Sequence, residues 1–355
     1  MTLCYYVTGH GFGHAIRTAQ ILKALPRDVD VIVRTTAAPS VFREELPGRS
    51  LRFLPAEFDC GSLQSDSVTT LARQTLDHYA EIEKRNNASL ADEVAFLKRE
   101  GVRCVVSDIP SFPLRAAFEA GVPGVAITNF TWHDIYQEYV ETDADQALLD
   151  RMGDEYRTAT VGLITPLATP TVENVFTNIE HVPIVARRGL DVGSDLRKAL
   201  RCETPHLALL YFGVWGLDLD WPALAAFRDW TFLTFDTPSQ SVANVKTLST
   251  DQWRYADIAA SVDLVITKPG YGTVTECIAN SVPLMYIPRQ GFVEAAALER
   301  GMAPWGGGIR IESEAFLNGN WGEALAAALS ARLNSEVYRT DGAAVVAERL
   351  LGLLA

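Results

Sequence analysis

The sequence has little positive charge for its size, and this argues against one large class of proteins. Its 31 lysines and arginines are outnumbered by 44 aspartates and glutamates, so the formal net charge is −13. Proteins that bind DNA or RNA by neutralising phosphates are usually basic, and we expect no nucleic-acid partner. The same balance disfavours a broad basic surface for anionic lipid. A single anionic ligand remains compatible, because backbone amides at a helix N-terminus can bind it locally.

Long apolar runs and paired cysteines are also missing. No stretch is long enough to span a bilayer, and the N-terminus lacks the charged and apolar regions of a signal peptide. We therefore expect a cytoplasmic protein with no transmembrane segment. The cysteines are odd in number and form no C-x-x-C pair, which favours free thiols in a reducing compartment and indicates no metal site. They are Cys4, Cys60, Cys104, Cys202 and Cys277.

Short apolar runs alternate with helical segments, and this series occurs twice. Such alternation predicts a parallel sheet covered by helices on both faces. A chain of 355 residues is long enough for two hydrophobic cores. Prolines and weak periodicity place the linker between Pro166 and Arg188. We expect an α/β protein with two Rossmann-like domains, residues 1–180 and 181–341, and a C-terminal helix over 342–355, the two sheets facing a central cleft.

The expected elements follow from apolar runs and helical spacing. Strands are expected at Leu3–Thr8, Val31–Val33, Leu51–Leu54, Arg103–Ser107, Val125–Thr128 and Val161–Ile164, the last strand of its half, and then at Leu207–Phe212, Thr231–Phe235, Asn244–Leu248, Leu264–Thr267 and Pro283–Ile287. Helices are expected before Pro26, over 71–100 with a break near Asn86 and Asn87, and at Phe112–Ala120, Trp132–Tyr139, Ala144–Thr158, Trp253–Ala260, Thr273–Asn280, Trp321–Leu333 and Gly342–Leu354.

A turn with two glycines joins the strand at 264–267 to the helix after it. It reads Thr-Lys-Pro-Gly-Tyr-Gly-Thr-Val-Thr-Glu over residues 267–276. Gly270 and Gly272 would let backbone approach a ligand closely, and the free N–H groups of the helix N-terminus suit a diphosphate. Thr273 and Glu276 have capping-box spacing. Glu276 is therefore either part of a helix cap or a carboxylate that accepts hydrogen bonds from ribose, and the spacing does not decide.

A second glycine-rich turn, Gly-His-Gly-Phe-Gly-His over residues 9–14, follows the first strand. It lacks the third glycine of G-x-G-x-x-G and is therefore not the dinucleotide fingerprint. His14 begins a helix, from which its imidazole can point into the cleft. A neutral histidine there could be the general base for an acceptor hydroxyl or amine. The alternative is a histidine that caps or packs against the loop.

Two further groups lie at the carboxyl ends of strands, where parallel sheets bind ligands. Asp108 could orient His14 and stabilise its charged form, or it could cap the helix that starts at Phe112. Asn-Phe-Thr-Trp-His over residues 129–133 could line an acceptor pocket with aromatic rings, or its aromatics could be ordinary core.

Three segments, in the same order along the chain, carry a family resemblance. They are Tyr-Tyr-Val-Thr-Gly-His-Gly-Phe-Gly-His-Ala at 5–15, Thr-Asn-Phe-Thr-Trp at 128–132 with Ile135, Tyr136 and 138–140, and Gly-Tyr-Gly-Thr-Val at 270–274 with Glu276. The sequence resembles the N-terminal domain of plant L-arabinokinases over nearly its whole length. It is more distantly similar to the N-acetylglucosaminyltransferase that makes lipid II, in His14 and in 273–276. The resemblance implies the GT-B glycosyltransferase fold.

The same resemblance implies a site for a UDP-sugar donor. Glu276 would bind the ribose, residues 270–273 the diphosphate, and the backbone of 245–248 the uracil. The implied donor residues are Gly213, Leu248, Lys268, Gly270, Tyr271, Gly272, Thr273, Glu276, Arg289, Gln290 and Glu294. His14 and Asp108 look like the catalytic His–Asp pair of other GT-B enzymes. On the acceptor side we expect His10, Phe12, Asn129 and Trp132.

Two departures from the family pattern matter. The plant proteins carry a kinase domain of the GHMP type after this region, and the present sequence has no matching Gly/Ser-rich phosphate loop, so we expect no arabinokinase activity. In addition, Gly-Val-Trp-Gly at 213–216 is bulkier than the glycine-rich loop usual after the first strand of the second domain.

We therefore expect a metal-independent, inverting glycosyltransferase with no cofactor beyond its nucleotide-sugar co-substrate. The acceptor would be a small molecule or bound to a carrier. The alternatives are a non-catalytic nucleotide-sugar sensor or partner subunit, because a fold does not fix a function, and a UDP-sugar epimerase.

Overall fold

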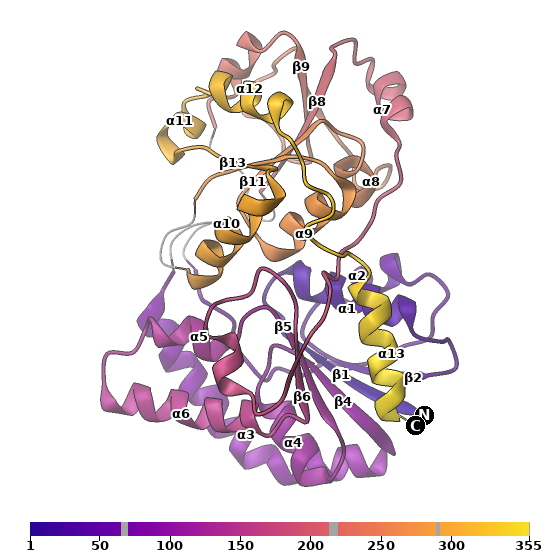
Figure 1. Ribbon diagram of the computed structural model, residues 1–355, viewed down its shortest axis with the longest axis vertical. Coiled ribbons are helices and arrows are strands. Elements are labelled where there is room, and N and C mark those ends of the chain that lie inside the picture. The colour runs from indigo at the N-terminus through magenta and orange to yellow at the C-terminus, as the bar shows by residue number, and fades with distance from the viewer. Residues whose placement is uncertain (65–69, 213–218, 289–291, 355) are drawn as a thin grey trace.

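Two parallel sheets stand one above the other in the molecule (Figure 1). The computed structural model describes residues 1–64, 70–212, 219–288 and 292–354. In this part of the chain the first sheet has seven strands in the order β3-β2-β1-β4-β5-β6-β7, and the second has six in the order β10-β9-β8-β11-β12-β13. Every strand pair is parallel. The expected α/β architecture is confirmed.

The first sheet is built from β1 to β7 and covered on both faces. Its strands are β1 Thr2–Val7, β2 Asp30–Arg34, β3 Arg52–Leu54, β4 Val102–Asp108, β5 Gly124–Thr128, β6 Val161–Ile164 and β7 Ile179–His181. Its helices are α1 Phe12–Ala24, α2 Pro39–Glu45, α3 Ala72–Arg99, α4 Phe112–Ala120, α5 Trp132–Gln137 and α6 Asp143–Arg157. Side chains along β1 point alternately to the two faces of the sheet and belong to two hydrophobic cores. Leu3 and Tyr5 pack with α1 on one face. Cys4 and Tyr6 pack with α3 and α4 on the other.

The second sheet repeats this arrangement with shorter strands. They are β8 His206–Tyr211, β9 Trp230–Thr234, β10 Val245–Thr247, β11 Leu264–Thr267, β12 Leu284–Tyr286 and β13 Gly308–Arg310. The helices are α7 Gly193–Leu200, α8 Tyr255–Ala259, α9 Tyr271–Asn280, α10 Val293–Trp305, α11 Ser313–Leu317 and α12 Gly322–Ser330. Leu209 packs with α8, α9 and α10 on one face, and Leu210 packs with α11 and α12 on the other.

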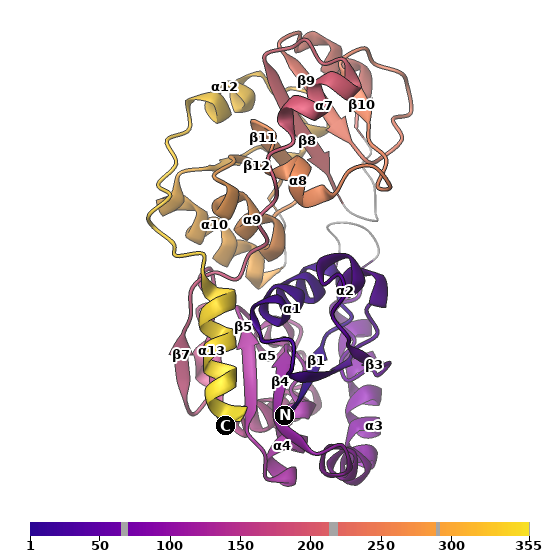
Figure 2. The same ribbon diagram turned by 90° about the vertical axis from the view of Figure 1, so that its right-hand side faces the viewer.

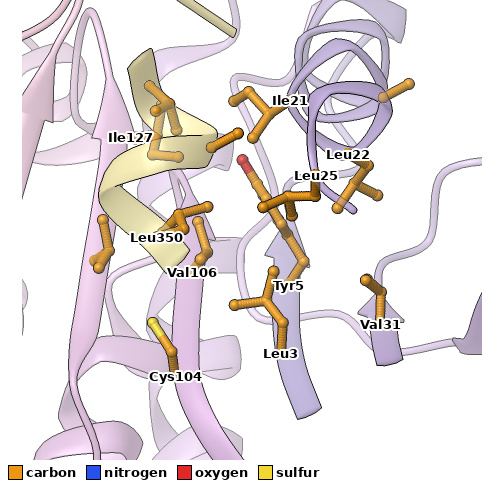
Figure 3. Close-up of a cluster of buried hydrophobic side chains, with 14 of the residues drawn as sticks. Leu3, Tyr5, Ile21, Leu22, Leu25, Val31, Cys104, Val106, Ile127 and Leu350 are labelled. Atoms are coloured by element: carbon orange, nitrogen blue, oxygen red, sulfur yellow. The ribbon is translucent and has the colours of Figure 1, made fainter. Parts of the chain in front are cut away.

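The last helix, α13 (Gly342–Leu354), returns to the first sheet. Figure 2 shows it running alongside that sheet toward the N-terminus. Its Leu350 lies in the same buried cluster as Ile21 of α1, Val106 of β4 and Ile127 of β5 (Figure 3). A Cβ on Gly342 would lie 2.1 Å from the carbonyl oxygen of Pro183, so the helix can start against the connecting segment only with glycine. The end of the chain therefore completes the core of the first half.

Two expectations about the first half are wrong. Helix α3 runs unbroken through Asn86 and Asn87, because neither side chain interrupts the backbone ladder: Asn86 donates to the Phe58 carbonyl oxygen and Asn87 to Glu83. The sheet also does not end at β6. The edge strand β7 follows it, and its three residues between polar neighbours are too short to give a period.

Several helices and strands were not predicted from the sequence. They are α2 in the first half and α7, α10, α11 and β13 in the second half. Helix α10 contains Gly301 and Pro304, residues that normally weaken a helix. A Cβ at Gly301 would lie 2.7 Å from Leu167 Cγ, so close packing against residues of the connection explains this glycine. We keep the division into residues 1–180, 181–341 and 342–355 as a proposal, whose first boundary falls inside β7.

Candidate active site

Two loops, each joining a parallel strand to the helix that follows it, lie close together between the sheets. Loop A (residues 8–11) joins β1 to α1, and loop B (residues 268–270) joins β11 to α9. Neither helix has a side-chain cap or an acidic residue in its first turn. A Cβ on Gly272 would lie 3.5 Å from Gly13 Cα, so the two helix ends are in contact. Because each N-terminus presents free N–H groups and partial positive charge, their meeting point suits an anion.

The capping-box interpretation of Thr273 and Glu276 is wrong. Helix α9 starts at Tyr271, two residues earlier than expected, and its N-cap is Gly270. Glu276 is therefore beyond the first turn and too far along the helix to cap it. This removes the helix cap as a role for Glu276 and leaves its carboxylate for another partner.

His14 and Asp108 are paired, as the sequence predicts. His14 Nδ1 lies 2.8 Å from Asp108 Oδ1, and Asp108 is fully buried at the end of β4. The alternative for Asp108 as a helix cap is wrong, because α4 has Ser111 at its N-cap position and no side-chain cap bond. Phe130 packs edge-on against the imidazole at 5.7 Å between ring centroids.

The sequence analysis missed Arg17, which lies one helical turn after His14 and is buried. Its Nε and Nη2 donate to the two carboxylate oxygens of Asp108 at 2.8 and 2.6 Å. Burial opposes ionisation of Asp108, but the Arg17 guanidinium outweighs it, so the pKa of Asp108 lies below its ordinary value. The i, i+3 spacing of His14 and Arg17 on one helix face is a signal that could have revealed the cluster.

The cluster extends from the first half to the second half. Arg17 Nη1 donates to Asn129 Oδ1 at 2.9 Å, and Asn129 Nδ2 donates to Glu294 Oε1 at 2.9 Å. Glu294 is in the first turn of α10, and the Arg17 guanidinium carbon also lies 5.3 Å from the Tyr271 ring centroid. Residues expected separately on the acceptor and donor sides are thus joined by hydrogen bonds.

The acceptor-side prediction included a set of aromatic and imidazole groups around loop A. Trp132 is buried, packs edge-on against His10, and donates its indole N–H to Asp59 at 2.7 Å. Asp59, which the sequence analysis missed, also accepts from the Thr8 hydroxyl at 2.9 Å. Burial raises its pKa to about 6, although Trp132 and Thr8 oppose the shift. Phe12 is 48% exposed at the start of α1. Ligand contact by these residues remains a prediction.

Glu276 binds an arginine from the connecting segment. Arg187 Nε and Nη2 lie 3.0 and 3.3 Å from its two oxygens, and Arg187 Nη1 lies 2.7 Å from Glu45 Oε1 at the end of α2. Glu276 is nearly fully buried, and burial raises its pKa even though Arg187 opposes the shift. For Glu45, Arg187 outweighs burial and the pKa is lowered. The carboxylate expected to bind ribose is thus held by a cation that also reaches the first half.

Solved structures resemble this chain over its full length. A UDP-glucosyltransferase from Polygonum tinctorium superposes with a TM-score of 0.65 at 16% identity, covering 99% of this chain and 98% of that chain. The glycosyltransferase SnogD from Streptomyces nogalater gives a TM-score of 0.60 at 17% identity, covering 100% of this chain and 99% of that one. The chain has the GT-B glycosyltransferase fold. At these identities the likeness to both proteins concerns the GT-B fold alone.

One curated relative is L-arabinokinase from Arabidopsis thaliana. It is 29% identical over 341 residues, which is 93% of this chain but 32% of that protein. The chain thus spans about a third of the length of L-arabinokinase, and the resemblance to the plant proteins is confirmed for that part. No family model matches the chain.

The remaining donor residues of the GT-B prediction lie around loop B, after β10, or outside the described residues. Lys268, Gly270, Gly272 and Thr273 are half-buried around the N-terminus of α9. Leu248 follows β10, where its backbone N–H donates to the Thr234 carbonyl oxygen at 2.7 Å. Gly213, Arg289 and Gln290 fall outside the part of the chain that the structure describes, as does the whole of the bulky segment 213–216.

The described residues also contain neither a metal-binding cluster nor a membrane span. No group of three or more histidine, cysteine, aspartate and glutamate side chains there could hold a metal ion. None of the helices within the described ranges combines the length and the apolar character needed to cross a bilayer. All five cysteines are free thiols.

Proposed function

We propose that this chain is a metal-independent glycosyltransferase that moves a sugar from a UDP-sugar to an acceptor hydroxyl or amine. The observation that carries the proposal is the meeting of two uncapped helix N-termini beside the His14–Asp108 pair. A pyrophosphate placed there would receive backbone N–H groups and the positive ends of two helices. Stabilisation of the leaving group is the requirement that a metal ion meets in other enzymes.

His14 would supply the chemistry. With its Nδ1 bonded to Asp108, its Nε2 would take the proton of the acceptor O–H or N–H group as the acceptor attacks the anomeric carbon. The bond between that carbon and the diphosphate oxygen breaks, and UDP leaves with the electron pair. Direct displacement inverts the anomeric centre.

Glu276 and the strand ends would hold the nucleoside. Its carboxylate would accept hydrogen bonds from ribose hydroxyls, and the backbone at 245–248 would contact the base. Two solved proteins of this fold support the choice of donor, the UDP-glucosyltransferase of Polygonum tinctorium and a Phytolacca americana protein complexed with UDP-2-fluoro-glucose. We infer that the residues expected on the acceptor side face the opposite wall of the same cleft.

A second candidate is a nucleotide-sugar sensor or partner subunit without turnover. One observation favours it: Arg187 already occupies both oxygens of Glu276, so a ribose must share or displace that ion pair. A protein that only binds nucleotide sugars could tolerate competition between ribose and Arg187 for Glu276, because it has no catalytic rate to maintain.

The separating experiment compares two variants in two assays. Incubation with UDP-glucose and 3,4-dichloroaniline, the compound in the Polygonum tinctorium complex, measures transfer, and calorimetry measures the UDP dissociation constant. His14→Ala should lower the transfer rate by about 10²–10⁴-fold, the usual contribution of a general base, and should leave UDP affinity unchanged. Glu276→Ala should weaken UDP binding by about 1–3 kcal/mol.

The matched control is His78→Ala, because His78 is an exposed histidine on α3 and its loss should change neither assay. Transfer that survives in His14→Ala would refute the assignment of the base. Tight UDP binding by the wild type with no transfer or hydrolysis for a panel of UDP-sugars and acceptors would favour the sensor.

A further inference from the structure

Arg17 makes more hydrogen bonds than a residue that only fills space would need. Its three guanidinium nitrogens reach both oxygens of Asp108 and the Asn129 side chain, at distances between 2.6 and 2.9 Å. The side chain is almost completely buried in the middle of the proposed site. A planar, permanently charged fork is suited to holding a carboxylate in one orientation.

The distances around His14 Nδ1 indicate which ring nitrogen carries the proton. Asp108 Oδ1 lies 2.8 Å away, and Arg17 Nη2 lies 3.2 Å away. A carboxylate oxygen at 2.8 Å from an unprotonated nitrogen would bring two lone pairs together, whereas a proton between them gives a charge-assisted hydrogen bond. The longer Arg17 contact is the one that need not be a hydrogen bond. Neutral His14 then has its free lone pair on Nε2.

This arrangement depends on Asp108 being an acceptor. Burial favours the protonated acid, and the bidentate contact with Arg17 favours the ionised form. A protonated Asp108 would donate its O–H to Nδ1, which would place the imidazole proton on Nε2. The ring could then no longer accept a proton from the sugar acceptor.

We propose that Arg17 is a positioning residue that fixes the tautomer of His14 by holding Asp108 as an ionised, bidentate acceptor. The inference rests on the proposed function, in which His14 Nε2 is the base. Through Asn129 and Glu294 the same guanidinium also connects the His14 pair to the second half of the chain.

Other ionisable groups near the pair do not compete for this role. Asp59 faces His14 as well, but its oxygens already accept from Thr8 and Trp132. Tyr5 and Tyr271 lie beside Arg17, and burial raises the pKa of both hydroxyls, Tyr271 to about 12, so both remain neutral.

The first test reads the tautomer directly in the wild-type protein. Nitrogen-15 NMR of histidine-labelled protein, with the His14 resonances assigned by their loss in His14→Ala, should show neutral His14 protonated at Nδ1. Neutral His14 protonated at Nε2 would overturn the inference. This measurement needs neither an Arg17 variant nor an identified substrate, so it stands even if transfer is never detected and the proposed function fails.

The second test uses Arg17→Met and Arg17→Lys, with UDP affinity and thermal unfolding measured alongside the transfer rate. Arg17→Met should bind UDP as the wild type does, move the His14 proton to Nε2, and lower the transfer rate by about 10²–10⁴-fold. Arg17→Lys keeps a cation beside Asp108 but loses the bidentate fork, so it should recover the Nδ1 tautomer and give a rate between those of Arg17→Met and wild type.

A folded Arg17→Met protein with an unchanged tautomer would contradict the proposal, and so would a lysine variant as slow as the methionine variant. If Arg17→Met does not fold, the lysine variant and the wild-type spectrum decide the question.

Discussion

Loop A and loop B are two versions of one backbone solution that carry different side chains. Each follows a central parallel strand, turns at glycine, and opens an uncapped helix that touches the other. After loop A the helix carries His14 and Arg17, whose ionic partner Asp108 lies in the same half. After loop B the helix carries Glu276, whose partner Arg187 comes from the connecting segment.

The two loops have similar backbones but different side chains, and this difference suggests that they have different roles. The ion pair beside loop A lies within one half, and a neutral side chain, Asn129, links it to Glu294 of the other, so its geometry can be held for chemistry. The charge beside loop B is shared with Glu45 of the first half through Arg187, so nucleotide binding and the contact between the halves involve the same carboxylate. The N-termini of α1 and α9 supply the anion site, and the side chains that follow each loop determine the role of that loop.

The largest expected effect is on the loop B side. Arg187→Met should lower the free energy of unfolding by about 3–5 kcal/mol, because it leaves the buried carboxylates of Glu45 and Glu276 without their shared partner. Denaturant unfolding of this variant and of Arg188→Met measures the loss, since Arg188 is the neighbouring, exposed arginine. A change below about 1 kcal/mol in Arg187→Met would show that the ion pair does not hold the halves together.

The next effect concerns Asp59 beside loop A. Its pKa is about 6, above its ordinary value of about 4. Between these pH values the folded state binds a proton that the unfolded state has released, so the contribution of Asp59 to stability falls as pH rises, by about 3 kcal/mol in total. Asp59→Asn should remove this part of the pH dependence.

Denaturant unfolding of Asp59→Asn and wild type at pH 4 and pH 7 gives the difference. Using both proteins cancels contributions from other groups, such as Glu155, whose pKa burial raises to about 7. Parallel pH profiles for the two proteins would show that Asp59 is not held in a buried, raised-pKa state.

The smallest effect tests the start of α9. Thr273→Ala should change the free energy of unfolding by less than about 0.5 kcal/mol, because Gly270 and not Thr273 occupies the N-cap. Thr142→Ala is the matched variant. Thr142 forms a complete capping box with Asp145, and its loss should cost about 1 kcal/mol. Equal losses in the two variants would restore the capping-box interpretation of Glu276.

Most of the fold was predictable because parallel strands are read from local apolar runs. Strands β6 and β11 and helices α4 and α13 match their expected bounds. The elements that were missed depend on packing that no window of sequence contains. Strand β7 is defined by its pairing with β6, and the glycine in α10 is explained by the side chain of Leu167.

The candidate site was predictable where a residue lies at a strand end. Asp108 and His14 were expected together because parallel strands end at one edge of a sheet, and they meet. Arg17, Asp59 and Arg187 were not expected, because each gains its role from a partner between 51 and 91 positions away. The buried contacts of Asp59 and Arg187 leave no local pattern in the sequence, whereas the spacing of His14 and Arg17 on one helix face is such a pattern.

The most direct test of the account is a crystal structure of this chain soaked with UDP. We expect diphosphate oxygens within about 2.7–3.2 Å of the backbone N–H groups that open α9, on the side facing Gly13, with the ribose against Glu276. Nucleotide bound elsewhere, or an empty pocket at saturating UDP, would contradict the claim that the two helix ends form a pyrophosphate site.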